Sequence, residues 1–454
     1  MDILQHIRHA THALLTAEGG PVLVGVSGGA DSIALLLALR EVGFSVEALH
    51  CNFALRAAES DRDEAFVRRL CRLRDIPLTV KHFRTKTTAQ RLGISVEMAA
   101  RDLRYQWFVQ MARRRAAQAV CVAHHRDDQA ETLLLHLVRG TGLRGLAGMA
   151  TCTLLDAPQD QTDNAPVRLI RPLLNVARAD IEAWLKQRDQ NWITDSTNLD
   201  ADAAARNKIR LQVIPILAQL NPSITETLCQ TATRMAEATQ LYDMAVHTER
   251  RAVETPDGID IHALRQRIAP RTVLYEILKE RGFTSEQASD IYDHLDGEPG
   301  HEWLSDKWRL LRDRGRLLWR RRDEQFYTEH TVLPLEGVAE PAPGMILLIR
   351  RQAVYPGFDI PRDARTACFD LEKLTLPLTI RMAAPADRFQ PFGMQGTRLV
   401  SDLLTDLKLS LFEKERQLVV ESGDRIVWVV GRRVAAGFEV DEHTRFAMTI
   451  TMIK

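Results

Sequence analysis

Residues 24–32 read Val24-Gly25-Val26-Ser27-Gly28-Gly29-Ala30-Asp31-Ser32, and they connect a short β-branched run to an apolar one. The run at 21–26 predicts a strand, and the run at 32–40 predicts a buried helix. Adjacent glycines permit turns that other residues avoid and let the backbone approach an anion closely. The free N–H groups at the start of a helix attract phosphate. We therefore predict a phosphate-binding loop that consists of Ser27, Gly28, Gly29, Ala30, Asp31 and Ser32.

Asp31 is unexpected in a site for a bare anion, because a carboxylate repels phosphate. A Mg²⁺ ion between the two would reverse this repulsion, so we predict that Asp31 is a ligand of Mg²⁺. The alternative is a plain strand-to-helix turn in which Ser or Asp caps the helix. The stretch has neither the GxxxxGKS/T nor the GxGxxG pattern, and it therefore does not support a Walker-type ATPase or a dinucleotide oxidoreductase.

The composition is that of an ordinary globular protein with several domains. The 454 residues are 45% hydrophobic and 26% charged, and 60 basic residues balance 60 acidic ones. This excludes a disordered chain and a protein that coats nucleic acid by bulk charge. Apolar runs such as Ile33–Leu39 are far shorter than the roughly 18 residues of a membrane span, and the N-terminus lacks a secretory pattern, so we expect a cytoplasmic protein.

The six cysteines indicate no metal centre and no disulfide framework. No two of them are closer together in the sequence than Cys51 and Cys71, so there is no CxxC pair. In a chain of this size that spacing is typical of scattered reduced thiols.

The first 215 or so residues alternate between strand-like and helix-like runs. Such alternation predicts an α/β fold with a parallel sheet, which binds its ligands at the carboxyl ends of the strands. The expected strands are 21–26, 46–51, 78–83 and 119–124, and the expected helices are 32–40, 61–74, 95–117 and 128–138.

The sequence pattern changes twice in the remainder of the chain. Helical periodicity from 221 to about 287 predicts a mainly helical middle domain, and the polar stretch 156–166 predicts a surface loop. Short β-rich runs from about 333 onward predict a closing α+β domain. We expect strands near 345–349, 378–382, 418–420 and 425–430, and domains at 1–216, 217–330 and 331–454.

The SGGxDS pattern after the first strand resembles the PP-loop of the N-type ATP pyrophosphatases, which cleave ATP to AMP and pyrophosphate while they adenylate an oxygen of the substrate. Within that group, further stretches resemble the tRNA(Ile)-lysidine synthase family, although Phe53 stands where a second His is common. Those stretches are Leu49–Arg56, Glu97–Tyr105, Ala123–Thr132, Arg139–Leu146, Arg171–Leu174, Asp195–Asn198, Arg206–Arg210 and Asp387–Gly393.

The resemblance implies a fold and a reaction. The fold is a parallel-sheet PP-loop catalytic domain (adenine nucleotide alpha hydrolase-like, Rossmann-like), followed by a helical domain and a C-terminal α+β domain that docks RNA. The reaction is the ATP-dependent ligation of free L-lysine to C2 of the wobble cytidine in the CAU anticodon of an isoleucine tRNA. It proceeds through an adenylated cytidine, releases AMP and pyrophosphate, and changes codon reading from AUG to AUA. ATP and Mg²⁺ are the implied cofactors, and a homodimer is left open.

Acidic residues follow the fourth predicted strand. Asp128 and Glu131 concentrate negative charge there, and they are candidates to bind Mg²⁺ or the lysine ammonium and to remove its proton. His124, at the strand end, is a candidate for polar contacts or proton transfer. The alternative is that Asp127 and Asp128 only cap the following helix.

Several arginines are candidates for contacts with phosphate. The resemblance assigns Arg101 and Arg104 to nucleotide or tRNA phosphates, whereas their spacing from Glu97 is also typical of a solvated helix face. Arg206, Arg210 and Arg388 are further tRNA candidates by resemblance. Residues 309–322 carry seven arginines against one Asp, with Trp308 and Trp319, which favours RNA binding over a plain Arg-rich β-ribbon.

Three other functions remain as alternatives. A tRNA thiolase would need catalytic or cluster cysteines, often as CxxC pairs, and the sequence has no such pair. A glutamine-dependent amide ligase would need an amidotransferase domain. A non-enzymatic RNA-binding protein could retain the loop without the chemistry, although Asp31, Asp127 and Asp128 are intact.

Overall fold

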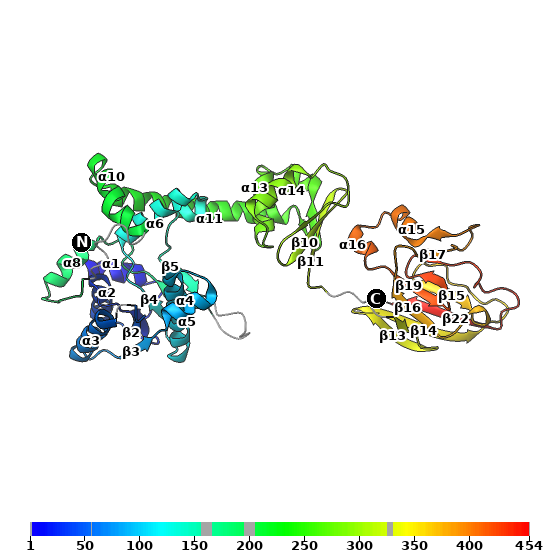
Figure 1. The fold of residues 1–454 in the computed structure, drawn as a ribbon, viewed down its shortest axis with the longest axis horizontal. Coiled ribbons are helices and arrows are strands. Elements are labelled where there is room, and N and C mark those ends of the chain that lie inside the picture. The colour runs from blue at the N-terminus through cyan, green and yellow to red at the C-terminus, as the bar shows by residue number, and fades with distance from the viewer. Residues whose placement is uncertain (1, 56, 156–165, 195–204, 325–329, 454) are drawn as a thin grey trace. The chain divides into compact units, whose positions relative to one another are not determined.

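The computed structural model describes residues 2–55, 57–155, 166–194, 205–324 and 330–453 (Figure 1). The chain divides into two compact units, Met1–Asp243 and Met244–Lys454, and helix α11 (Ile224–Arg251) contains the boundary. Over the described residues, every helix is too short or too polar to cross a bilayer.

A six-stranded sheet organises the first unit. The strands β3, β2, β1, β4 and β6 run parallel, and β5 pairs antiparallel with β6 at one edge. In spatial order the strands are β3 Leu78–His82, β2 Val46–Asn52, β1 Val22–Gly25, β4 Ala119–Cys121, β6 Val167–Ile170 and β5 Cys152–Leu155. The predicted parallel α/β fold is therefore confirmed.

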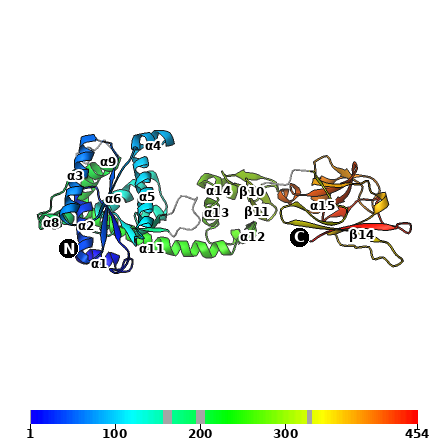
Figure 2. The same ribbon diagram turned by 90° about the horizontal axis from the view of Figure 1, so that it is seen from below.

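Helices cover both faces of this sheet (Figure 2). One face packs a core of β1 and β2 side chains such as Val22 and Val24 against Ile33 and Leu36, whereas Leu23 packs on the other face with Trp107 and Phe108. The helices on the first face are α1 Ile3–Thr11, α2 Ala30–Val42, α3 Ala57–Leu73 and α8 Arg178–Lys186. Those on the second face are α4 Thr85–Leu92 and α5 Val96–Arg114.

The remaining helices of the first unit follow the fourth strand and close the unit. They are α6 Arg126–Arg139, α7 Leu143–Leu146, α9 Ala205–Lys208, the π-helical turn Ile209–Val213, α10 Ile214–Leu220 and the first part of α11. The four predicted strands are present, but β4 ends at Cys121 rather than at the predicted residue 124. Most of the expected loop at 156–166 lies outside the described residues.

The second unit begins with small helices on an antiparallel sheet. The sheet order is β7-β8-β11-β10-β9, and residues such as Leu274, Ile277, Leu310 and Leu317 form its core. Its strands are β7 Glu254–Thr255, β8 Gly258–Asp260, β9 Glu302–Leu304, β10 Trp308–Asp313 and β11 Arg316–Arg321. Its helices are α12 Ile261–Arg265, α13 Pro270–Lys279 and α14 Ser285–Asp293.

This sheet corrects the expectation that the pattern from 221 to about 287 is helical throughout. Strands β7 and β8 interrupt the helical pattern at 254–260, where the sequence Thr255-Pro256-Asp257-Gly258 turns the chain. Turn residues of this kind end a helix and favour a hairpin. Strands this short carry too few residues for their period of two to be recognised in the sequence.

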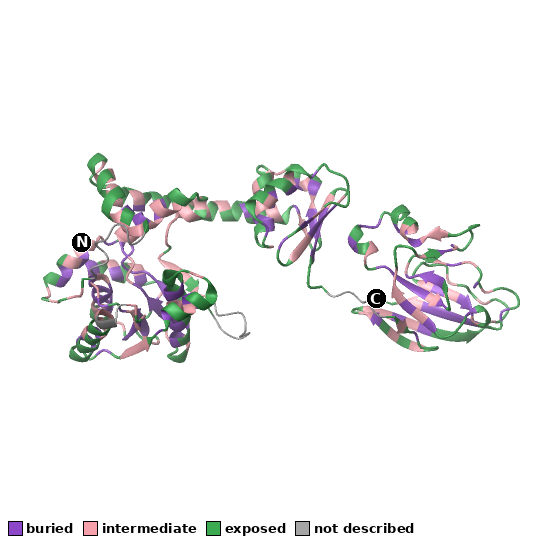
Figure 3. Cartoon of the chain, viewed as in Figure 1, coloured by how far each residue is buried: buried purple, intermediate pink, exposed green. Residues whose placement is uncertain are grey.

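Two antiparallel sheets form the C-terminal part of the chain. Buried side chains from both sheets form one hydrophobic core (Figure 3). One is β12-β16-β19-β20-β21, the other is β13-β14-β22-β15, and β17 pairs with β18. The strands are β12 Thr331–Val332, β13 Gly337–Ala342, β14 Met345–Ala353, β15 Thr366–Asp370, β16 Leu378–Met382, β17 Arg388–Phe389, β18 Arg398–Leu399, β19 Leu418–Ser422, β20 Arg425–Val429, β21 Arg433–Val434 and β22 Phe446–Met452. The helices are α15 Val400–Asp406 and α16 Leu411–Lys414, with a 3₁₀ turn at Leu371–Lys373. The expected α+β architecture is confirmed.

Candidate active site

The predicted phosphate-binding loop joins β1 to α2 at the carboxyl edge of the sheet. The hydroxyl of Ser32 accepts hydrogen bonds from the backbone N–H groups of Ser27 (3.2 Å) and Gly28 (3.3 Å) and donates to the carbonyl of Gly29 (3.0 Å). Gly28 has a φ of +99°, and an added Cβ would lie 3.1 Å from the Cδ1 atom of Ile193. Only glycine therefore fits this turn, as its sequence predicts.

His50 and Asn52, in the last three residues of β2, support this loop. His50 is buried, and its Nδ1 donates a 2.8 Å hydrogen bond to the carbonyl of Val26, directly before the loop. Burial lowers the pKa of His50, so the ring stays neutral near neutral pH. Asn52 accepts from the N–H of Ala54 and donates to Glu64. These two members of the Leu49–Arg56 stretch thus hold the strand ends in place, and Arg56 lies outside the described residues.

A pocket of about 240 Å³ opens beside the loop. Its wall comes from the ends of β1, β2 and β4 and from one face of α5. A Cβ on Gly25 would lie 2.9 Å from the ring of Phe108, so glycine is needed where the strand passes this helix. The lining residues are Gly25, Val26, Ser27, Asp31, Ser32, Leu49, Cys51, Phe53, Arg104, Tyr105, Phe108, Val122, Ala123 and His124.

Phe53 contributes an aromatic wall rather than a titratable group. Its ring stacks on Phe83 with centroids 5.5 Å apart, and the guanidinium carbon of Arg104 lies 5.3 Å from its centroid. Arg104 therefore lines the pocket, whereas Arg101 is exposed and lies over the ring of Tyr105. The structure separates these two arginines, which the spacing had grouped together.

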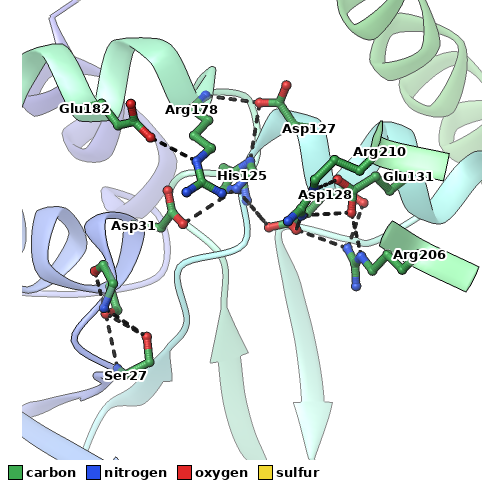
Figure 4. Close-up of polar contacts among 12 residues, drawn as sticks. Ser27, Asp31, His125, Asp127, Asp128, Glu131, Arg178, Glu182, Arg206 and Arg210 are labelled. Atoms are coloured by element: carbon green, nitrogen blue, oxygen red, sulfur yellow. Dashed lines mark hydrogen bonds and ion pairs between the residues drawn. The ribbon is translucent and has the colours of Figure 1, made fainter. Parts of the chain in front are cut away.

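His125 is the centre of an acidic cluster next to the loop (Figure 4). Its side chain is 2% exposed, and Nε2 lies 3.7 Å from Asp31 and 3.5 Å from Asp128, while Nδ1 lies 3.4 Å from Asp127. Burial alone would lower the pKa of His125, but these carboxylates outweigh it and raise the pKa. The same histidine, together with the N–H of Arg178, overcomes the effect of burial on Asp127 and lowers the pKa of that carboxyl to about 2.

The predicted catalytic acids occupy two different environments. Asp128 accepts a 3.1 Å hydrogen bond from the backbone N–H of His125, so it also caps α6 as the alternative proposed. Glu131 is fully buried, and its oxygens accept from Nε of Arg206 (2.6 Å) and Nε of Arg210 (2.5 Å). Asp128 keeps 14% of its side chain exposed and is the more accessible carboxylate. Which of the two removes a proton stays a prediction.

His124 faces the pocket from the end of β4. Burial is the main reason that its pKa falls to about 4, although Asp128 opposes the shift. Its buried Nδ1 atom has no hydrogen-bond partner among the described residues. His124 is thus a neutral imidazole with one unused ring nitrogen, which suits a polar contact with a bound ligand.

Asp31 fits a shared magnesium site rather than a complete one. No group of three or more His, Cys, Asp or Glu side chains across the described ranges is arranged to hold a metal ion. The buried Oδ1 atom of Asp31 nevertheless lacks a hydrogen-bond partner, and burial raises the pKa of this carboxyl. Mg²⁺ typically takes one or two carboxylates together with substrate phosphates, which matches what Asp31 offers.

The other predicted residues belong to the second unit or lie outside the described residues. Arg388 is exposed on β17 in the second unit, and Asp195–Asn198 lie outside the described residues. Residues 309–322 form the β10–β11 ribbon, as the alternative anticipated, and Arg309 and Arg320 both pair with Glu415. RNA binding by this ribbon stays a prediction.

Two residues of the cluster were missed or under-weighted in the sequence. From the sequence alone, His125 is included only within the stretch Ala123–Thr132, and Arg178 is not singled out. A signal for Arg178 existed, because Arg171-Pro172-Leu173-Leu174 ends near the sheet edge and the next helix begins at Arg178.

Family models agree with this architecture. Family models match residues 3–217 as a PP-loop domain, 255–322 as a TilS substrate binding domain and 378–448 as a TilS substrate C-terminal domain. The chain is 40% identical to a tRNA(Ile)-lysidine synthase of Bacteroides thetaiotaomicron and 42% identical to one of Parabacteroides distasonis, each over 440 residues, with 97% of both chains covered. Among solved structures it is similar to a tRNA thiolase of Methanococcus maripaludis, with a TM-score of 0.42, 15% identity, and 52% of this chain and 79% of that chain covered.

The fold and the loop define an ATP-using enzyme of the PP-loop class, in which the loop stands at the carboxyl edge of a parallel sheet beside an acidic cluster. Sequence identity of 40–42% over 97% of the chain identifies the family within this class. The chain belongs to the tRNA(Ile)-lysidine synthase family and is an ATP-dependent ligase that acts on tRNA.

Proposed function

We propose that this protein ligates free L-lysine to C2 of the wobble cytidine in the CAU anticodon of an isoleucine tRNA. The observation that carries the proposal is the meeting of the SGGADS loop, the pocket and the acidic cluster at one edge of the sheet. A nucleoside triphosphate, a nucleobase and an amine must meet in this reaction. This edge of the sheet has side chains that suit the binding of each of them.

The first step is adenylation of the cytidine. The C2 oxygen attacks the α-phosphorus of ATP, the bond between the α- and β-phosphates breaks, and pyrophosphate leaves with the electron pair. The N-terminus of α2 would face the phosphates, and Asp31 would hold Mg²⁺, whose charge would offset the charge that develops on pyrophosphate. Arg104 and the aromatic wall of the pocket suit a flat base.

The second step replaces the activated oxygen with lysine. The ε-amine attacks C2, the C2–O bond breaks, and AMP leaves with the former carbonyl oxygen. The amine must be neutral to attack, so a base removes a proton from the bound ammonium. Asp128 fits this role because it is partly exposed and belongs to the cluster around His125, whereas Glu131 fits a role in holding Arg206 and Arg210.

The tRNA would extend beyond this site. Arg101, Arg206, Arg210 and Arg388 are the proposed phosphate contacts, with the β10–β11 ribbon as a further surface. A cytoplasmic location fits a tRNA-modifying enzyme, and the homodimer remains a proposal that size measurements in solution would test.

The reaction is tested with purified full-length protein, ATP, Mg²⁺ and labelled lysine. The isoleucine tRNA with the CAU anticodon should gain label, and the methionine tRNA with the same anticodon should not. Label on neither tRNA, or on both equally, would contradict the proposal. An Asp31→Asn variant provides the matched negative control.

A further inference from the structure

Arg178 stands at the acidic cluster without a role in the steps above. It is the first residue of α8, and its guanidinium group lies beside Asp31 and His125 in Figure 4. Burial raises the pKa of Asp31, while the charges of His125 and Arg178 act in the opposite direction. Arg178 is thus close enough to the Asp31 carboxylate, in the first turn of α2, for the two charges to interact.

The surrounding residues hold Arg178 in position from two sides. Its backbone N–H donates a 3.1 Å hydrogen bond to Oδ2 of Asp127, which fixes the start of α8 against the cluster. Its Nε donates a 3.1 Å hydrogen bond to Glu182, one turn further along the helix. These bonds orient the planar group, which lowers the entropy that a ligand must overcome to bind it.

The outer edge of the guanidinium is unused. Within the described residues, its two terminal nitrogens make no hydrogen bond, and no carboxylate other than Glu182 pairs with it within 4 Å. The side chain is 35% exposed, so a ligand can reach it. An arginine that is held at Nε and open at both terminal nitrogens presents the paired donors that match two phosphate oxygens.

We infer that Arg178 is a pyrophosphate-binding residue that contacts the β- and γ-phosphates of ATP and the pyrophosphate that leaves. This inference rests on the proposed function. When the bond between the α- and β-phosphates breaks, the electron pair moves to the bridging oxygen that departs with pyrophosphate, and a fixed cation beside that oxygen stabilises the charge. Glu182 and Asp127 are positioning residues for Arg178.

Product inhibition separates this role from a merely structural one. In the Arg178→Gln variant, the inhibition constant for inorganic pyrophosphate should rise about tenfold or more, because two charge-assisted hydrogen bonds are lost. The inhibition constant for AMP should remain unchanged. Arg178→Lys should recover part of the loss, since it keeps the charge but not the paired donors. Glu182→Gln should give a smaller loss than Arg178→Gln.

Arg188→Gln is the matched control, because Arg188 follows the same helix but pairs with Glu41 on α2. It should leave both inhibition constants unchanged. Unchanged pyrophosphate inhibition in Arg178→Gln would overturn the inference. An equal loss of pyrophosphate and AMP inhibition would also overturn it, because it would mean that the loop itself had been disturbed.

Direct titration with pyrophosphate tests the role of Arg178 independently of the proposed ligase reaction. Calorimetry of inorganic pyrophosphate with full-length protein in magnesium buffer requires no tRNA and no turnover. If wild-type protein binds pyrophosphate and Arg178→Gln binds it at least tenfold more weakly, Arg178 has the stated role even if the lysine assay fails. Equal affinity of the two proteins would overturn the inference even if the lysine assay succeeds.

Discussion

Asp31 and His125 face each other across the carboxyl edge of the sheet, with Oδ2 of Asp31 3.7 Å from Nε2 of His125. Asp31 lies in the first turn of α2, within the phosphate-binding loop, and His125 immediately precedes α6. The contact therefore joins the phosphate-binding part of the site to the acidic cluster.

Asp31→Asn should abolish AMP formation and leave tRNA affinity nearly unchanged. The amide keeps the shape of the side chain but removes the charge that would hold Mg²⁺. AMP release is measured by chromatography and tRNA affinity by filter binding, with the exposed Asp61→Asn as control. An equal loss of both properties would show that Asp31 supports the fold rather than the chemistry.

Gly28→Ala should weaken ATP binding and also lower the free energy of unfolding by about 1–3 kcal/mol. The alanine would have to adopt a φ of +99° with its Cβ close to Ile193. Gly43→Ala is a sharp control, because Gly43 has a φ of +110° but no atom near the added Cβ. Both variants should lose stability in urea, and only Gly28→Ala should lose ATP affinity in calorimetry. The prediction fails if ATP affinity falls equally in the two.

Asp128→Asn and Glu131→Gln should have different consequences. Asp128→Asn should slow lysine transfer from the adenylated tRNA, while ATP-dependent adenylation of the cytidine persists. Glu131→Gln leaves two guanidinium groups without their buried partner, so it should cost about 3 kcal/mol of stability. Single-turnover kinetics and urea unfolding measure the two effects. If Glu131→Gln keeps normal stability and loses only lysine transfer, Glu131 rather than Asp128 is the base.

His124 should make the first unit sensitive to acid. Its pKa of about 4 in the folded protein lies below its usual value of 6.5, so the unfolded chain binds the proton more readily. This stability is present above pH 6.5 and is lost as the pH falls towards 4. At pH 5 the loss should be roughly 1–2 kcal/mol.

The difference in urea midpoint between pH 7 and pH 5 measures this effect. His124→Gln should show a smaller difference than the wild type, while the exposed His247→Gln should show the same difference as the wild type. A His124→Gln protein as acid-sensitive as the wild type would contradict the buried, neutral state of the ring.

Patterns of short range were sufficient for much of the fold. The strand predicted at 378–382 is β16, Leu378–Met382, because apolar and polar residues alternate along its whole length, Leu-Thr-Ile-Arg-Met. The strand predicted at 119–124 is β4, Ala119–Cys121, and it ends early because His124 and His125 leave the sheet to enter the site. The strand propensity of residues 119–124 does not predict this early end of the strand.

The site residues that belong to contiguous motifs could be predicted from the sequence. The residues that reach the site from distant parts of the chain could not. The loop glycines and Asp31 are contiguous, so their sequence is sufficient to identify them. Glu131 obtains its partner Arg206 from 75 residues further along the chain, and Phe108 enters the pocket through the packing of α5. Such contacts depend on tertiary structure, which no local spacing encodes.

The most direct test of the proposed chemistry follows one oxygen atom. The isoleucine tRNA is prepared with a heavy oxygen isotope at the C2 carbonyl of its wobble cytidine and is incubated with the protein, ATP and lysine. Mass spectrometry should find the heavy atom in AMP, because the carbonyl oxygen departs with the adenylate. Heavy oxygen retained in the tRNA while AMP forms would contradict adenylation of the base.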